Sequence, residues 1–122
     1  MILGIGVDIV HLPRIASLIT RRGSKVLAKR ILSSREHKEF ETFTDERQQL
    51  VYLGSRWCIK EAVYKALYPI HKLEWKQVSV IKQAGKPDLD IVNGKLYGIS
   101  KTHVSLSHDG DYAIAQVILE SQ

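Results

Sequence analysis

Residues 56–67, RWCIKEAVYKAL, place a charged column beside an apolar one on what the spacing predicts is a single helix. At about 3.6 residues per turn, Trp57, Glu61 and Lys65 share one side of this helix with Tyr68. The neighbouring apolar stripe must pack against another part of the chain and consists of Ile59, Ala62, Val63, Ala66 and Leu67. We therefore expect Glu61 to lie at the edge of the buried region.

Two interpretations of Glu61 remain open at this point. A glutamate four residues before Lys65 forms the pair that supports an exposed helix by about 0.3–0.5 kcal/mol, which is a structural role on a solvated face. A functional role requires a second group elsewhere in the chain. Asp8 is the candidate, because it is the only acidic residue in the N-terminal segment 2–10, ILGIGVDIV.

Segment 2–10 alternates with period two and predicts a strand, with apolar residues on one face and Gly4, Gly6 and Asp8 on the other. Glycines inside a strand mark places where another backbone or a ligand comes close. The alternative is a β-bulge followed by an aspartate that caps the next helix. Because Mg²⁺ is held by one or two carboxylates together with phosphate oxygens and waters, Asp8 and Glu61 would suit a bound pyrophosphate.

Length and composition predict one globular domain, residues 1–122, with enough core to fold without disulfides. The single cysteine, Cys58, excludes an internal disulfide and favours a reducing compartment. No apolar run approaches the roughly 20 residues that cross a bilayer, and no leader precedes the first strand. We expect a cytoplasmic protein without membrane contact, or one of the mitochondrial matrix or plastid if the source is eukaryotic.

The charge balance is basic, with 18 Lys and Arg against 13 Asp and Glu, a net charge of +5. Such a balance raises encounter rates with anions without choosing among them. The basic residues that cluster early in the chain are Arg14, Arg21, Arg22, Lys25, Lys29 and Arg30. This cluster is either a solvated face or a binding surface. It lacks the interleaved aromatic residues of single-strand binders, so we expect an acidic protein partner and no nucleic acid.

The remaining pattern predicts an α+β fold with one long central helix packed on a mainly antiparallel sheet. A capping box at 33–36, an Asp45 cap and the stop at Pro69 set the helix boundaries. The predicted helices are 12–22, 34–43, a long one after Asp45 and a short piece at 96–100. The predicted strands are 2–10, 75–83, 88–92, 102–107 and 112–119, with turns at 84–87 and 108–111. His108, where a strand meets a turn, has either a structural or a catalytic role.

Four segments together resemble the holo-acyl-carrier-protein synthase family of 4'-phosphopantetheinyl transferases. They are GIGVDIVHLPRI (4–15), RWCIKEAVYKAL (56–67), Gly-Lys-Pro (85–87) and HVSLSHDGDYAIAQVIL (103–119). The resemblance implies a 4'-phosphopantetheinyl transferase-like module and Mg²⁺-dependent transfer of phosphopantetheine from coenzyme A to a serine of an apo acyl carrier protein. That reaction supports fatty acid biosynthesis and leaves adenosine 3',5'-bisphosphate.

The resemblance also implies roles for individual residues. Asp8 and Glu61 would hold Mg²⁺, Lys65 would offset charge on the phosphates, and His108 would complete the catalytic set. The implied coenzyme A contacts are Arg56, Lys65, Gly85, Lys86, Pro87, Ser107 and His108, and the implied carrier-docking residues are Arg14 and Arg21. The general base stays open between His108 and a water held by the two carboxylates.

Short, one-module members of this family form trimers with coenzyme A between neighbours, so the resemblance implies a homotrimer. The alternative from composition is a basic carrier-protein- or RNA-binding module without catalysis. Loss of activity on chelation would separate an enzyme from such a module, whose binding would instead weaken with salt.

Overall fold

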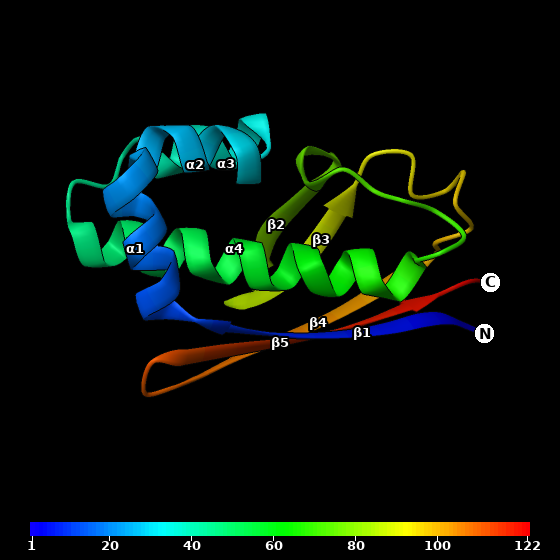
Figure 1. Ribbon diagram of the computed structural model, residues 1–122. Coiled ribbons are helices and arrows are strands. Elements are labelled where there is room, and N and C mark those ends of the chain that lie inside the picture. The colour runs from blue at the N-terminus through cyan, green and yellow to red at the C-terminus, as the bar shows by residue number, and fades with distance from the viewer.

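Helix α4 (Glu46–Leu67) lies along one face of a three-stranded antiparallel sheet in the computed structural model, which describes residues 1–122 (Figure 1). The strand order is β1–β5–β4, so β1 and β4 form the two edges. A two-stranded antiparallel sheet, β2–β3, packs beside β4. The strands are β1 (Ile2–His11), β2 (Val78–Gln83), β3 (Lys86–Ile91), β4 (Lys101–Asp109) and β5 (Tyr112–Glu120). This arrangement confirms the predicted α+β fold.

The boundaries of α4 follow from its cap and its stop. The Asp45 carboxylate accepts a hydrogen bond from the Gln48 amide at 3.0 Å, which satisfies one of the free donors of the first turn. The helix ends at Leu67, because the residue before a proline is driven out of the helical region, and Tyr68 is extended before Pro69. Both predicted boundary signals are therefore confirmed.

The glycines of β1 allow its backbone to approach α4 closely. A Cβ atom on Gly4 would lie 1.8 Å from the Ala66 carbonyl oxygen, and one on Gly6 would lie 1.7 Å from that of Ala62. Another backbone, and not a ligand, therefore occupies the space above these glycines. The register also shifts between Ile2 and Gly4, as the bulge alternative required, but the aspartate of this strand caps no helix.

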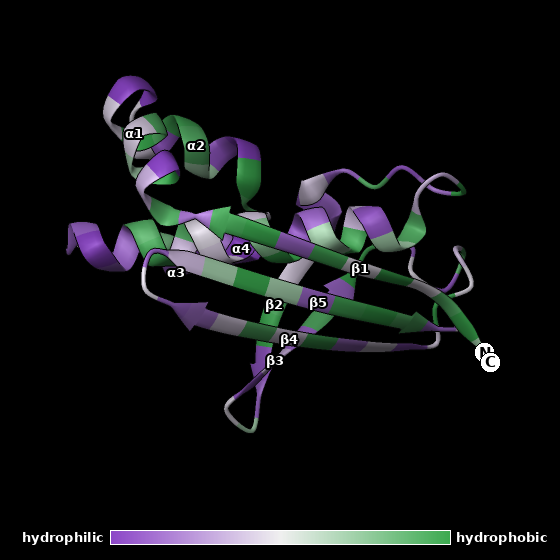
Figure 2. Cartoon of the chain, turned by 60° about the horizontal axis from the view of Figure 1, so that its bottom comes forward, coloured by the Kyte–Doolittle hydropathy of each residue, from purple (hydrophilic) through white to green (hydrophobic).

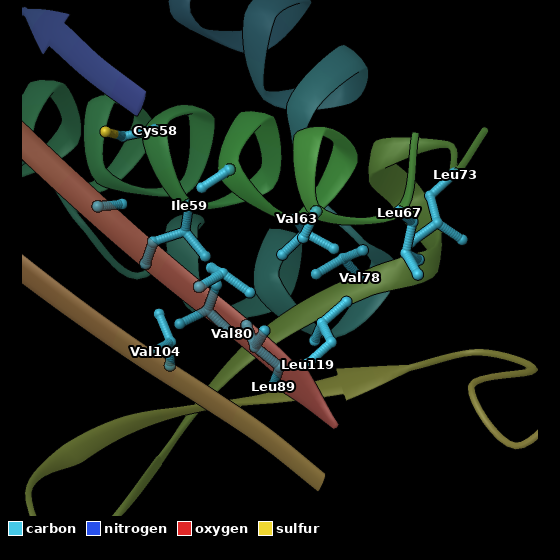
Figure 3. Close-up of a cluster of buried hydrophobic side chains, with 14 of the residues drawn as sticks. Cys58, Ile59, Val63, Leu67, Leu73, Val78, Val80, Leu89, Val104 and Leu119 are labelled. Atoms are coloured by element: carbon cyan, nitrogen blue, oxygen red, sulfur yellow. The ribbon is translucent and has the colours of Figure 1, made fainter. Parts of the chain in front are cut away.

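The predicted apolar stripe of α4 forms the centre of the core. Figure 3 shows Ile59, Val63 and Leu67 pointing toward the strands beneath the helix. Their partners from the two sheets include Val78, Val80, Leu89, Val104 and Leu119, all buried. Both sheets thus pack against one face of α4. No layer covers the opposite face of the three-stranded sheet (Figure 2).

Three short helices cover the N-terminal part of α4: α1 (Leu12–Arg22), α2 (Ser24–Ile31) and α3 (Ser34–Phe40). The prediction of α1 is confirmed, and so is the capping box that starts α3. Helix α2 was missed, because its eight residues offer neither a side-chain cap nor an acidic first turn. Helix α3 is shorter than predicted and ends three residues early, where Thr42 and Phe43 form turn-type hydrogen bonds.

Several predicted elements of the second half need correction. The expected strand 75–83 begins with a 3-10 turn, Trp75–Gln77, and becomes a strand only at Val78. Lys86 and Pro87 belong to β3 and not to the turn, because Ala84 and Gly85 reverse the chain alone with φ of 54° and 77°.

No helix forms at 96–100. Residues 92–98 make consecutive turns, because Asn93 and Gly98 adopt positive φ values of 64° and 82°, outside the right-handed helical region. The hairpin of β4 and β5 is confirmed, although both strands extend further and leave only Gly110 and Asp111 in the turn. None of the helices combines the length and the apolar character that spanning a membrane requires.

Candidate active site

Asp8 and Lys65 meet where the edge strand β1 runs beside α4. The Lys65 ammonium donates to Asp8 Oδ1 at 3.0 Å and to the Val7 carbonyl oxygen at 3.1 Å. The Lys65 side chain is 51% exposed and that of Asp8 14%. A half-exposed ammonium keeps donors available for a ligand, because two contacts leave room for a third. The structure therefore places two of the predicted catalytic residues together.

Glu61 lies one turn before Lys65, close enough to Asp8 for their charges to interact. Burial raises the pKa of Glu61, the Asp8 carboxylate raises it further, and Lys65 opposes the change. Two carboxylates with one partly shared lysine leave excess negative charge, which a divalent cation would relieve. No third acidic, histidine or cysteine ligand joins them, so phosphate oxygens and waters would have to complete the coordination of Mg²⁺. The donor set fits such an ion.

A pocket of about 250 Å³ opens beside these carboxylates, between β1, α1 and α4. Its lining residues are Asp8, Ile9, Val10, His11, Arg14, Ile15, Trp57 and Glu61. Arg14, predicted for carrier docking, thus shares a pocket with the predicted metal ligands, whereas Arg21 lies exposed at the end of α1. His11 borders the pocket where β1 ends, and its ring packs 4.9 Å from that of Tyr112 on β5.

Arg56 lies on a different side of α4, against α3. Its guanidinium stacks 3.8 Å from the centre of the Tyr52 ring, and its Nε lies 3.8 Å from the Glu36 carboxylate. The buried Nε has no hydrogen-bond partner. A pocket of about 320 Å³ at this place also includes Arg47, which sequence reasoning did not single out. Two guanidinium groups at one pocket suit an anionic ligand.

The other predicted coenzyme contacts lie at the far edge of the sheet. Lys86 and Pro87 border a pocket of about 320 Å³ between the β2–β3 hairpin and β4, and Gly85 forms the tip of that hairpin. Ser107 and His108 are exposed neighbours on β4, paired with Ile114 and Ala113 of β5. Because β5 separates β4 from β1, one protomer does not bring these residues to Asp8 and Glu61.

Lys60, the residue before Glu61, has a structural role in the core instead. Lys60 is fully buried and donates to the carbonyl oxygens of Ile31 at 2.8 Å and Trp75 at 3.1 Å, and to the Glu36 carboxylate. Glu36 also accepts from the Ser33 and Val80 amides, at 3.0 and 2.9 Å. Sequence reasoning missed this buried pair, because helical spacing alone does not tell which of two adjacent charges points inward.

Comparisons with known proteins identify the family of the chain. The model of the 4'-phosphopantetheinyl transferase superfamily matches residues 4–117. Among relatives, the holo-[acyl-carrier-protein] synthase of Staphylococcus carnosus is 36% identical, over 98% of both chains. That of Staphylococcus saprophyticus is 38% identical, over 98% of this chain and 99% of the relative.

Solved structures give the same result. The holo-[acyl-carrier-protein] synthase of Neisseria meningitidis superposes with a TM-score of 0.86 at 31% identity, covering 99% of this chain and all of the other. The Bacillus anthracis enzyme, solved in complex with CoA (3',5'-ADP), gives 0.81 at 31% identity, covering 100% and 99%. A family model and relatives that span almost the whole chain lead to one conclusion: the chain belongs to the holo-[acyl-carrier-protein] synthases of the 4'-phosphopantetheinyl transferase superfamily.

Proposed function

We propose that the chain transfers 4'-phosphopantetheine from coenzyme A to a serine of an apo acyl carrier protein at the pocket between β1, α1 and α4. The observation that carries the proposal is the meeting of Asp8 and Glu61 at this pocket, with Lys65 bonded to Asp8 beside it, in a chain of this family. Phosphoryl-type transfer depends mainly on positioning and on charge neutralisation, and these three residues can provide both.

In this proposal Asp8 and Glu61 hold Mg²⁺, which when bound supplies positive charge to the pyrophosphate oxygens. Lys65 donates to the same phosphate oxygens with the proton that its two protein contacts leave free. The serine oxygen forms a bond to the phosphorus that bears pantetheine, and the bond from that phosphorus to the bridging oxygen breaks. The leaving group is adenosine 3',5'-bisphosphate, whose new negative charge Lys65 stabilises.

The nucleotide end of coenzyme A carries further phosphate, and the pocket beside Arg56 suits it. Arg47 and Arg56 supply guanidinium donors in a fork geometry that matches phosphate oxygens. Gly85, Lys86 and Pro87, with Ser107 and His108, would contact the remaining parts of the cofactor. These assignments rest on the family resemblance together with the pocket beside Lys86 and Pro87.

The basic surface of α1 and α2 would receive the carrier protein. The chain has no acidic residue between Ile9 and Arg35, so none of the exposed cations here is neutralised from within its own segment. Arg14 connects this surface to the catalytic pocket, and Arg21 extends it along α1. An acidic carrier docked here would bring its serine toward Asp8 and Glu61, and electrostatic attraction would speed its association.

A homotrimer would complete the site. The uncovered face of the sheet carries Ile5, Val7, Ile9, Tyr112 and Ile114, each 43–60% exposed (Figure 2). A contiguous apolar surface of this kind is typical of an interaction site. Because the two halves of the predicted coenzyme site lie at opposite edges of one sheet, a neighbouring copy would supply the half near Lys86.

Mass spectrometry of an apo acyl carrier protein incubated with this protein, coenzyme A and Mg²⁺ tests the proposal. We expect the carrier to gain the mass of one phosphopantetheine, and excess chelator to prevent the gain. Arg21→Glu should weaken carrier binding and leave coenzyme A binding intact, since Arg21 lies exposed at the end of α1, outside the catalytic pocket. Light scattering of the same preparation should give three times the 13.9 kDa of one chain. Carrier binding without any mass gain would instead indicate a non-catalytic module.

A further inference from the structure

Tyr52 lines the pocket beside Arg56 but has no role in the proposed reaction. It shares that pocket with Arg47, Ser55 and Arg56. Its hydroxyl is already used, because it donates to the Glu36 carbonyl oxygen at 3.2 Å in the interior. What Tyr52 offers at the pocket is therefore the face of its ring.

The Tyr52 ring is held in one orientation. The residue is 5% exposed, and the ring of Phe43 meets it edge-on at 5.1 Å, centre to centre. The ring of Phe40 lies 5.9 Å away on the same measure. Burial raises the pKa of Tyr52 to about 12, so the hydroxyl keeps the proton that it donates to Glu36. The ring therefore cannot turn without losing these contacts.

The guanidinium of Arg56 lies on this fixed ring, with its Cζ 3.8 Å from the ring centre. A guanidinium is attracted to the face of an aromatic ring, and more strongly where water is excluded. Only 12% of the Arg56 side chain is exposed. Its Nη1 donates to the Ser55 hydroxyl at 3.2 Å, and the Glu36 carboxylate faces its Nε at 3.8 Å. The plane of the guanidinium is thus set before a ligand arrives.

One nitrogen of Arg56 stays available to a ligand. Its Nε is buried and its Nη1 is bonded to Ser55, whereas Nη2 has no partner within the chain and is reached by solvent. An arginine side chain has many rotamers, and ordering them when a ligand binds costs affinity. A guanidinium that the ring already holds avoids much of this cost. The ring of Tyr52 therefore prepares Nη2 to donate.

We infer that Tyr52 is a positioning residue: the face of its ring holds the Arg56 guanidinium in the plane from which Nη2 donates to the 3'-phosphate of coenzyme A. The inference rests on the proposed function and on its assignment of this pocket to the nucleotide end. Because Tyr52 acts through Arg56, its effect should appear only with a substrate that carries the 3'-phosphate. Dephospho-coenzyme A lacks that phosphate and retains the pyrophosphate at which transfer occurs.

Steady-state transfer to an apo acyl carrier protein from each of the two coenzymes tests the inference. Tyr52→Leu removes the aromatic face, so we expect KM for coenzyme A to rise about 10-fold with little change in kcat. KM for dephospho-coenzyme A should stay as in the wild type. Tyr52→Phe keeps the ring and should keep the wild-type KM for both coenzymes.

Phe40→Leu is the matched control for loss of packing. Phe40 belongs to the same buried cluster and contacts the Tyr52 ring, but the cation–π contact of Arg56 is with Tyr52. Phe40→Leu should lower the free energy of unfolding, measured by urea denaturation, without raising either KM. A general packing defect would instead affect both coenzymes and both variants alike.

A double variant tests whether Tyr52 acts through Arg56. Arg56→Lys keeps the charge but removes the planar group that lies on the ring, so KM for coenzyme A should rise. Adding Tyr52→Leu to Arg56→Lys should raise this KM no further, because the second change removes a contact that is already lost.

Fluorinated phenylalanine at position 52 provides a test that leaves the shape of the core almost unchanged. Fluorine withdraws negative charge from the face of the ring and so weakens its attraction for a cation. KM for coenzyme A should therefore rise from phenylalanine to its singly and triply fluorinated forms. KM for dephospho-coenzyme A should stay constant along the series, which applies even where Tyr52→Leu does not fold.

Three results would overturn the inference. One is an equal rise of KM for both coenzymes in Tyr52→Leu, and another is a constant KM for coenzyme A along the fluorinated series. The third is a wild-type protein with the same KM for the two coenzymes, which would mean that it does not bind the 3'-phosphate. A wild-type protein that transfers from neither coenzyme would refute the proposed function itself, so the two failures are distinguishable.

Discussion

Lys60 and Lys65 lie five residues apart on α4, and each contacts one carboxylate, yet the two pairs have opposite surroundings. The pair of Lys60 with Glu36 is sealed, with side chains 0% and 1% exposed. The pair of Lys65 with Asp8 is open, at 51% and 14%. Glu36 and Lys60 share their remaining hydrogen-bonding capacity with four backbone groups of other elements.

This difference separates a structural ion pair from a functional one. Burial makes every unpaired charge costly, so the sealed pair must be fully satisfied by the protein and has nothing left for a ligand. The open pair keeps a free donor on Lys65 and lies next to Glu61, whose pKa is raised by burial and by Asp8. The protein thus leaves negative charge unbalanced at the pocket. A bound metal ion would neutralise this charge and could hold a pyrophosphate there.

The largest effect on stability should come from breaking the sealed pair. Glu36→Gln keeps the shape of the side chain but leaves the Lys60 ammonium buried without a counter-charge. We expect the free energy of unfolding, measured by urea denaturation, to fall by about 3–5 kcal/mol. That is a large part of the roughly 5–15 kcal/mol available to a typical domain.

A double variant controls for this result. Glu36→Gln combined with Lys60→Met removes both charges, so the chain should regain much of the lost stability, because an apolar side chain replaces the stranded ammonium. A Glu36→Gln protein as stable as the wild type would mean that the two groups do not form a charged pair in the folded chain.

The second effect should appear in activity and not in stability. Glu61→Gln preserves shape but removes a predicted metal ligand, so transfer at limiting Mg²⁺ should fall by about 100-fold or more. The folded protein should not be weakened. Because the folded-state pKa of Glu61 is raised, its ionised form is disfavoured in the folded state, and neutral glutamine removes that cost.

The direction of the Glu61 pKa shift predicts how the stability difference between the two proteins depends on pH. Below the ordinary carboxyl pKa both proteins are neutral at this position and should unfold alike. As pH rises through the raised pKa of Glu61, only the wild type acquires the cost, so Glu61→Gln should become the more stable protein. Urea denaturation at several pH values measures the difference. Wild-type transfer by Glu61→Gln at limiting Mg²⁺ would refute its assignment as a metal ligand.

Sequence patterns predicted the parts of this fold in which local chemistry decides the outcome. The cap at Asp45, the box at Ser33 and Glu36, and the stop at Pro69 are short-range signals, and each marks the boundary it predicted. The 96–100 helix was wrong, because positive φ at Asn93 and Gly98 was not apparent from the apolar spacing.

The candidate site was predictable only in part, because short-range sequence signals do not show contacts between distant segments. Asp8, Glu61 and Lys65 follow from one strand face and one helix column, together with the family motifs. The role of Glu36 depends on packing between distant segments, because Glu36 meets Lys60 across 24 residues. Sequence periodicity predicts which face of a helix or strand a residue occupies. Only tertiary contacts determine what packs against that face.

The smallest effect should come from Lys65→Met, the open counterpart of a change at Lys60. A half-exposed lysine paired with one carboxylate contributes little, so the free energy of unfolding should fall by about 1 kcal/mol or less. Added salt should shrink the difference, since it screens exposed charges. Glu61 would lose the charge that lowers its pKa, so the remaining loss should appear at neutral pH and diminish in acid. Lys60→Met, measured in parallel by urea denaturation, should cost several times more, because it strands Glu36 in the core. Equal losses of unfolding free energy from the two substitutions would mean that burial does not distinguish the two ion pairs. The interpretation of one pair as structural and the other as functional would then be wrong.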